Sequence, residues 1–161
     1  MVYAVEKDGK YMNRKILSWV LVVLWMSLIF YLSHQPATES NKLSREITEK
    51  IVKVVEEVAS DTRSNPKRLN HIIRKGAHFF AYFILGILLM YSLYRNHTYG
   101  LKAASIALII CILYAISDEV HQIFIPGRSG QLADVILDSA GGIVGILSYK
   151  AYRLNIFNKS K

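Results

Sequence analysis

Long apolar segments alternate with polar ones along most of the chain. They cover residues 16–33, 77–94, 101–120 and 132–152, and few formal charges fall within them. A helix that crosses the hydrocarbon core of a bilayer needs about 20 mostly apolar residues, and each segment approaches that length. A soluble helix would carry a polar outer face instead. The pattern therefore predicts an all-α fold, a bundle of four transmembrane helices.

Residues 40–60, between the first two apolar segments, follow a different pattern. Apolar residues recur there every three or four positions, and mainly Lys and Glu fill the other positions. This spacing predicts an amphipathic helix, which we expect to pack on the bundle or to lie at the membrane interface. Further along, Asn65-Pro66 fits a helix start. A helix from there to Arg95 would exceed the thickness of the bilayer core.

Charge and composition agree with a membrane protein. Apolar residues make up 52% of the chain and the net charge is +8. The basic residues flank the apolar segments, as in membrane proteins, and no basic stretch has the interleaved aromatic residues of a nucleic-acid surface. We expect the lipid bilayer as a partner and no nucleic acid. The sequence does not define an oligomeric state, although Gly141 and Gly145 would allow another helix to approach closely.

The distribution of Lys and Arg also predicts an orientation. The short connecting segments favour a cytoplasmic location for both termini. We therefore expect cytoplasmic tails at residues 1–15 and 155–161, on either side of a transmembrane domain of residues 16–154. The first apolar segment is too long for the core of a signal peptide, so it is read as a retained helix.

Ionisable residues gather at one end of the predicted bundle. The antiparallel arrangement brings together residues from the second helix, the third helix, the following turn and the fourth helix: Arg74, Lys75, His78, Tyr82; Asp118, Glu119, His121, Gln122; Arg128; Asp134, Asp138. Spacings of three and four residues place most members of each set on one helix face. Charges in membrane helices are costly and usually pair or line a polar cavity. We therefore expect a polar chamber near the outer leaflet.

Four uses of this chamber remain open from the residues alone. Histidine and carboxylates can ligate Zn²⁺ or Mn²⁺, but no HExxH or other dense ligand motif occurs, so the sequence assigns no metal ligand and leaves any cofactor unknown. The basic residues could hold a phosphate, with His78, Asp118, Glu119 and His121 as acid/base candidates. Binding without catalysis, and an ion-pair cluster that only fixes helix register, are the other two.

Two stretches resemble the VanZ-like family: RKGAHFFAYFILG and YAISDEVHQIFIPGRSGQLADVILDSAGGIVG. The matching positions are Ser33, Pro36, Arg74, Lys75, His78, Tyr82, Asp118, Glu119, Gln122, Pro126, Gly127, Arg128, Asp134, Asp138 and Gly142. The resemblance covers roughly residues 17–150. It implies a multi-pass protein of the bacterial cell membrane, and the founding member of the family gives resistance to the glycopeptide teicoplanin. Asp138 stands at a position where many members have asparagine.

The working hypothesis is recognition of an anionic envelope lipid or peptidoglycan precursor. Arg74 and Arg128 would contact the anionic group, supported by Lys75, Tyr82 and Gln122. The acids would orient the arginines and histidines or bind a metal: Asp118, Glu119, Asp134, Asp138. The alternatives are a membrane enzyme acting on a phospholipid or polyprenyl phosphate, and a structural partner protein without catalysis.

Overall fold

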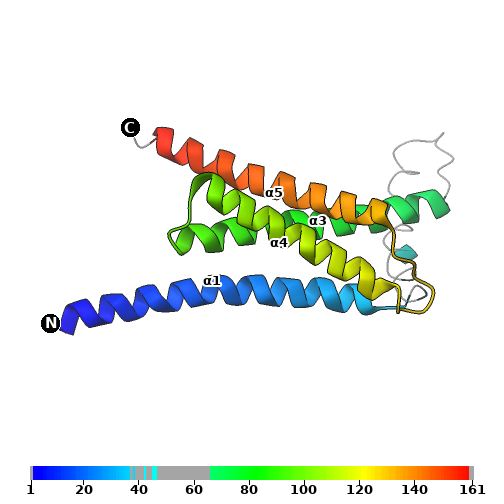
Figure 1. Ribbon diagram of the computed structural model, residues 1–161, viewed down its shortest axis with the longest axis horizontal. Coiled ribbons are helices and arrows are strands. Elements are labelled where there is room, and N and C mark those ends of the chain that lie inside the picture. Colours follow the sequence, from blue (N-terminus) through cyan, green and yellow to red (C-terminus); the bar gives the residue numbers. More distant parts are fainter. Residues whose placement is uncertain (1, 37, 39–41, 43–44, 47–65, 160–161) are drawn as a thin grey trace.

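The part of the chain that the structure describes forms four long α-helices. The computed structural model describes residues 2–36, 38, 42, 45–46 and 66–159. The helices are α1 (Val2–His34), α3 (Pro66–Arg95), α4 (Gly100–Gln122) and α5 (Leu132–Lys159), and the described residues contain no strand (Figure 1). The predicted all-α class is confirmed. The amphipathic helix predicted at residues 40–60 falls almost wholly outside the described residues.

Each helix contains a stretch long and apolar enough to cross a membrane. These stretches are Arg14–His34, His71–Arg95, Gly100–Gln122 and Leu132–Ile156. Many large apolar side chains on them are exposed, such as Leu24 on α1 and Leu113 on α4. A large exposed apolar surface is unfavourable in water and marks contact with a membrane or a partner. The outer surface of the bundle is therefore suited to lipid.

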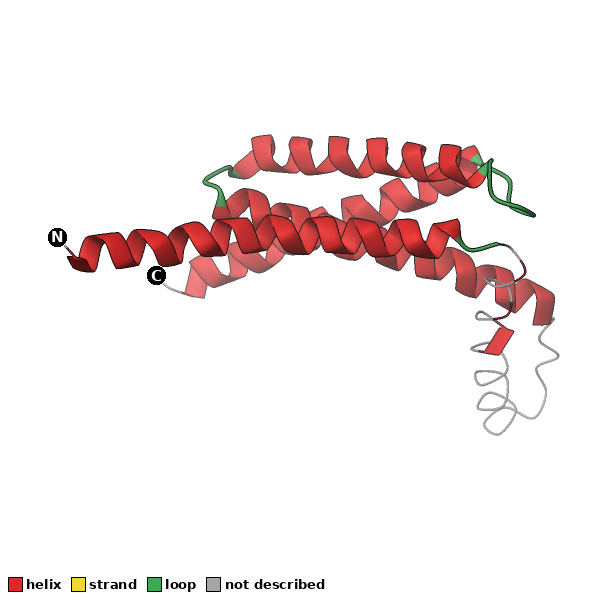
Figure 2. Ribbon diagram, turned by 90° about the horizontal axis from the view of Figure 1, so that it is seen from below, coloured by secondary structure: helices red, strands yellow, loops and turns green. Residues whose placement is uncertain are grey.

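The ends of the helices gather at two opposite ends of the bundle. Helix α1 begins and α5 ends at the same end, while α3 begins beside the turn between α4 and α5 at the other (Figure 1). Helix α1 lies along one side of the bundle, against α3 and α4 (Figure 2). Since α1 begins at Val2 and α5 ends at Lys159, the segments predicted as tails are mostly helical.

Glycines bring α3 and α5 into backbone contact. A Cβ atom on Gly141 would overlap the carbonyl of Phe79, and one on Gly145 would overlap that of Phe83. The predicted small-residue surface thus packs within the chain, as small-residue surfaces of membrane helices do. This close approach sets the start of α5 directly beside the polar residues of α3.

Side-chain hydrogen bonds fix α1 against the other helices. Trp25 donates from Nε1 to the carbonyl of Ala81, at 2.9 Å, and Tyr114 donates from its hydroxyl to the carbonyl of Met26, at 2.5 Å. Ser92 donates to the carbonyl of Ser18 at 2.9 Å. These bonds connect α1 to α3 and α4 along its length, and its last turn is thereby held beside the end of α4.

Candidate functional site

A cavity of about 70 Å³ lies where α3 begins, α4 ends and α5 begins. Twelve residues line this cavity, which we call the α3–α5 cavity: Arg74, Lys75, His78, Glu119, Gln122, Gly127, Arg128, Ser129, Gln131, Asp134, Leu137 and Asp138. Eight of them were candidates from the sequence. Of the remaining candidates, Asp118 and Tyr82 are buried in the bundle core, and His121 faces elsewhere.

Three helices converge on one buried cluster at the edge of the cavity. His78 on α3, Asp118 on α4 and Asp138 on α5 each offer one ligand atom, and these atoms lie within 4.8 Å of one another. Asp138 is 0% exposed and Asp118 is 2% exposed. Nδ1 of His78 is 3.8 Å from Oδ2 of Asp138. We call these three residues the His–Asp–Asp cluster.

Several polar atoms of this region have no hydrogen-bond partner among the described residues. They are both carboxylate oxygens of Asp138, Oδ1 of Asp118 and the hydroxyl of Tyr82. Buried polar atoms in proteins nearly always have a partner, and a buried carboxylate without one is costly. The two carboxylates of the cluster therefore lack, among the described residues, the partners that buried acids normally have.

Asp118 is held by two donors on the same oxygen. The Ser33 hydroxyl donates to Oδ2 at 2.7 Å, and the Gln122 side-chain amide donates to it at 3.3 Å. Oδ1 has no hydrogen-bond partner among the described residues. The sequence did not identify Ser33 as a site residue, and its match to the family pattern after the first helix was the available signal.

Two basic residues of the cavity have different kinds of partner. Nζ of Lys75 donates to Oδ1 of Asp134 at 2.5 Å. Arg128 donates from one terminal nitrogen to the carbonyl of Leu32 at 3.3 Å, and its Nε has no partner among the described residues. Burial lowers the pKa of the Arg128 guanidinium, which nevertheless stays cationic.

Glu119 holds the turn that carries Arg128. One of its carboxylate oxygens accepts the backbone N–H of Gln131 at 2.8 Å. Within the turn, Gly127 has a positive φ of 74°, a conformation that glycine adopts without steric cost. The Glu119 carboxylate is thereby engaged in shaping the cavity wall.

His121 does not reach the cavity. Its Nε2 lies 3.0 Å from Nδ1 of His34, and its ring packs on Phe30 with the centroids 4.5 Å apart. At 100° per residue, three residues beyond Asp118 amount to a position about 60° away around the helix. That rotation turns His121 toward α1, so the structure separates it from His78.

The fold and the buried cluster together define a class of protein. Four apolar helices with ionisable groups at one end are the features of a multi-pass membrane protein. The VanZ/LLP1 family model matches residues 18–156, and the chain belongs to this family. The resemblance seen in the sequence is thereby confirmed. Searches of curated proteins and of solved structures gave no match.

Proposed function

We propose that the α3–α5 cavity binds the anionic headgroup of an envelope lipid or of a lipid-linked peptidoglycan precursor. The observation that carries the proposal is that three cationic side chains line one cavity: Arg74, Lys75 and Arg128. Arginine and lysine are the usual partners of phosphate oxygens, and arginine can make paired hydrogen bonds to them. A cavity of this volume has room for a phosphate-sized group, whereas the acyl chains would remain in the bilayer.

Arg128 is the residue best placed to contact such a group. Its bond to the Leu32 carbonyl uses one terminal nitrogen, and Nε is buried without a partner among the described residues. A guanidinium carries five N–H donors in a planar fork. Donors therefore remain for an oxyanion in the cavity.

The depth of the cavity in the membrane also supports a lipid ligand. Next to it, Ile123, Phe124 and Leu132 are exposed at 61%, 77% and 76%. Apolar side chains exposed beside charged ones suit the boundary between headgroups and acyl chains. The turn between α4 and α5 would then lie at the level of lipid headgroups, which in the predicted orientation is the outer leaflet.

Native mass spectrometry of the purified protein with added membrane lipids tests the proposal. Arg128→Gln should lower the apparent lipid affinity about tenfold or more, because a hydrogen bond to a charged group contributes about 1.5–3 kcal/mol. Lys102→Gln is the control, since Lys102 is exposed at the opposite end of the bundle. Equal lipid occupancy in the wild type and in Arg128→Gln would contradict the proposal.

A role in teicoplanin resistance follows from the family resemblance, and we propose that headgroup recognition contributes to it. Cells that produce the wild-type protein should survive higher teicoplanin concentrations than cells that produce Arg128→Gln at the same membrane level. Cells with Lys102→Gln should behave like the wild type. Equal protection by all three proteins would show that resistance does not depend on headgroup binding in the cavity.

The second candidate is a membrane enzyme that acts on a phospholipid or polyprenyl phosphate. The position of His78 favours it, because this histidine lines the cavity and faces the buried Asp138 at 3.8 Å. A histidine beside a carboxylate is a common acid/base arrangement. His78→Gln should then abolish release of phosphate from such lipids, while a protein that only binds them releases none in either form.

A further inference from the structure

We infer that His78, Asp118 and Asp138 form a binding site for one divalent transition-metal cation, such as Zn²⁺ or Mn²⁺. The sequence contains no motif for this site because the three residues come from three different helices and lie far apart along the chain. One imidazole nitrogen and two carboxylate oxygens are a donor set that these ions accept.

The geometry of the His–Asp–Asp cluster is close to that of a metal site. Its three candidate ligand atoms lie within 4.8 Å of one another. Ligand atoms about 2.0–2.2 Å from a tetrahedral Zn²⁺ lie about 3.4 Å apart. The candidate ligand atoms would therefore have to approach one another by at most about 1.4 Å to bind one Zn²⁺.

A cation would complete the chemistry of the buried acids. It would give a partner to one carboxylate oxygen of Asp138 and to one of Asp118, two acids that carry oxygens without a hydrogen-bond partner among the described residues. Its two positive charges would balance the two buried carboxylates, and buried charges are normally paired or bound to a metal. The need for a positive partner follows from the burial of Asp138 and Asp118, which are 0% and 2% exposed. It is therefore independent of the distances between the candidate ligand atoms.

The neighbours of Asp118 resemble the support that metal ligands usually have. Ser33 and Gln122 both donate to Oδ2, which leaves Oδ1 without a partner among the described residues. Ligating carboxylates in metal sites are hydrogen-bonded in this way by surrounding groups that fix their orientation. We assign Ser33 and Gln122 as positioning residues for the cation.

The cation site would also open toward the headgroup cavity. His78 and Asp138 line that cavity, so a further coordination position would face it, as in metal sites that keep one open position. The cation would add positive charge beside Arg74 and Arg128, where four acids now face three basic side chains. The effect of the cation on headgroup binding rests on the proposed function, whereas the cation site itself does not.

Metal titration of the full-length protein in detergent tests the inference. After treatment with EDTA and desalting, the wild type should bind one equivalent of Zn²⁺, measured by calorimetry and by elemental analysis. Asp138→Asn and His78→Gln should each weaken binding at least tenfold. His71→Gln is the matched control, because His71 is exposed on the same helix and lies outside the cluster. No stoichiometric Zn²⁺ in the wild type, or unchanged affinity in both cluster variants, would overturn the inference.

X-ray absorption of the wild-type Zn²⁺ complex gives a result that does not depend on how the variants fold. The spectrum should show nitrogen and oxygen ligands at about 2.0–2.2 Å, including one imidazole. A sulfur ligand would place the ion at the buried Cys111 and would refute the assignment.

The two proposals can fail separately. Arg128→Gln should lose lipid and keep Zn²⁺, because Arg128 is not in the cluster. If Zn²⁺ binds at the cluster and no lipid is retained, the headgroup proposal is wrong and the cation site stands. If lipid is retained and no Zn²⁺ binds, the cation site is wrong and the headgroup proposal stands.

Discussion

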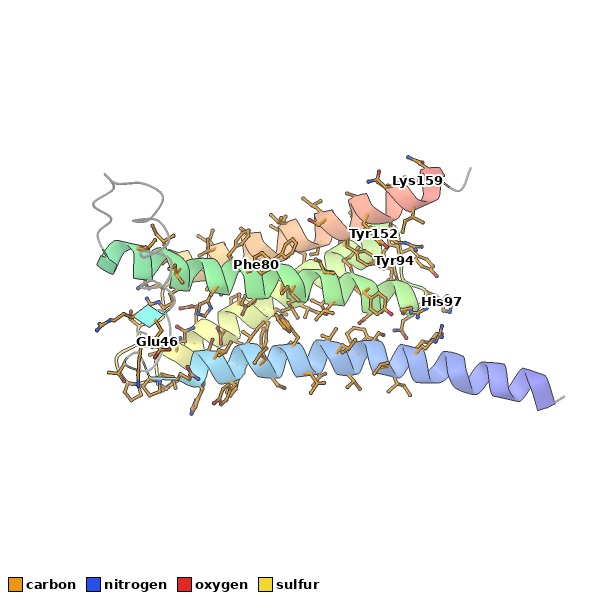
Figure 3. The ribbon with its side chains drawn as sticks, turned by 180° about the vertical axis from the view of Figure 1, so that it is seen from behind. Glu46, Phe80, Tyr94, His97, Tyr152 and Lys159 are labelled. Carbon is orange, nitrogen blue, oxygen red and sulfur yellow. The ribbon has the colours of Figure 1, made fainter. Side chains whose placement is uncertain are left out.

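The two ends of the bundle have opposite chemistry. At the end opposite the His–Asp–Asp cluster, a cavity of about 320 Å³ is lined by basic and aromatic residues: Arg14, Lys15, Tyr91, Tyr94, Arg95, His97, Tyr99, Tyr149 and Arg153. Figure 3 shows Tyr94 and His97 at this end, with Tyr152 nearby on α5. Arg153 lies over the ring of Tyr94, 5.6 Å from its centroid, and Tyr94 meets Tyr149 edge to face at 5.3 Å.

The difference shows which end needs a functional explanation. Tyrosine and arginine are typical of the membrane interface, where rings and charges both find favourable surroundings. The basic and aromatic end is thus explained by anchoring in the bilayer. The acidic end, with the His–Asp–Asp cluster, holds buried carboxylates with atoms that have no partner among the described residues, an arrangement that destabilises a fold. Such groups in membrane proteins usually mark a functional site, so the acidic end is where we place function.

Replacing Asp138 should give the largest change in stability. In EDTA, Asp138→Asn should raise the free energy of unfolding by about 1–3 kcal/mol, because a neutral amide costs less to bury than a carboxylate that has no partner among the described residues. The measurement is thermal unfolding in detergent. With Zn²⁺ added, the wild type should be more stable than Asp138→Asn, since only the wild type keeps the full ligand set.

A paired acid on the same helix provides the control for this prediction. Asp134 lies one turn before Asp138 and pairs with Lys75. Asp134→Asn should change stability by less than about 1 kcal/mol, and toward lower stability, because partly exposed ion pairs contribute little. If Asp138→Asn also destabilises the protein in EDTA, Asp138 has a partner that the described residues do not include.

Two buried serines allow a smaller and more specific comparison of the ends. Ser33 donates to Asp118 at the acidic end, and Ser92 donates to the carbonyl of Ser18 at the other end. Ser33→Ala and Ser92→Ala should each lower stability by about 1 kcal/mol, the net value of one hydrogen bond. Only Ser33→Ala should also weaken Zn²⁺ binding, by about tenfold, as loss of a supporting hydrogen bond does. Equal Zn²⁺ affinity in both variants would remove Ser33 as a positioning residue.

The smallest effect is expected at His121. His121→Gln should leave both lipid and Zn²⁺ affinity unchanged, because its ring contacts His34 and Phe30 away from the cavity. The same substitution at His78 should weaken Zn²⁺ binding. A loss of Zn²⁺ affinity in His121→Gln would show that both histidines serve the site.

Much of the architecture is readable from the sequence because a bilayer imposes simple rules. The need for about 20 apolar residues identifies a membrane helix without any knowledge of its neighbours. The predicted helix from Pro66 to Arg95 matches α3. Gly141 and Gly145, which the sequence identified as allowing a close helix approach, pack against α3. The sequence was less informative at the ends of α1 and α5, because charged residues end an apolar segment without ending its helix.

The composition of the site was decided by tertiary structure. Sequence spacing grouped residues on helix faces, but it does not give the rotation of one helix relative to another. In the structure His121, about 60° around α4 from Asp118, turns toward α1, and helix packing brings Ser33 of α1 to Asp118 of α4. The pairing of Lys75 with Asp134 is set in the same way. The sequence alone therefore determined that ionisable groups gather at one end of a membrane bundle. Only helix packing, through the backbone contact of α3 with α5, determined that one histidine and two aspartates meet there.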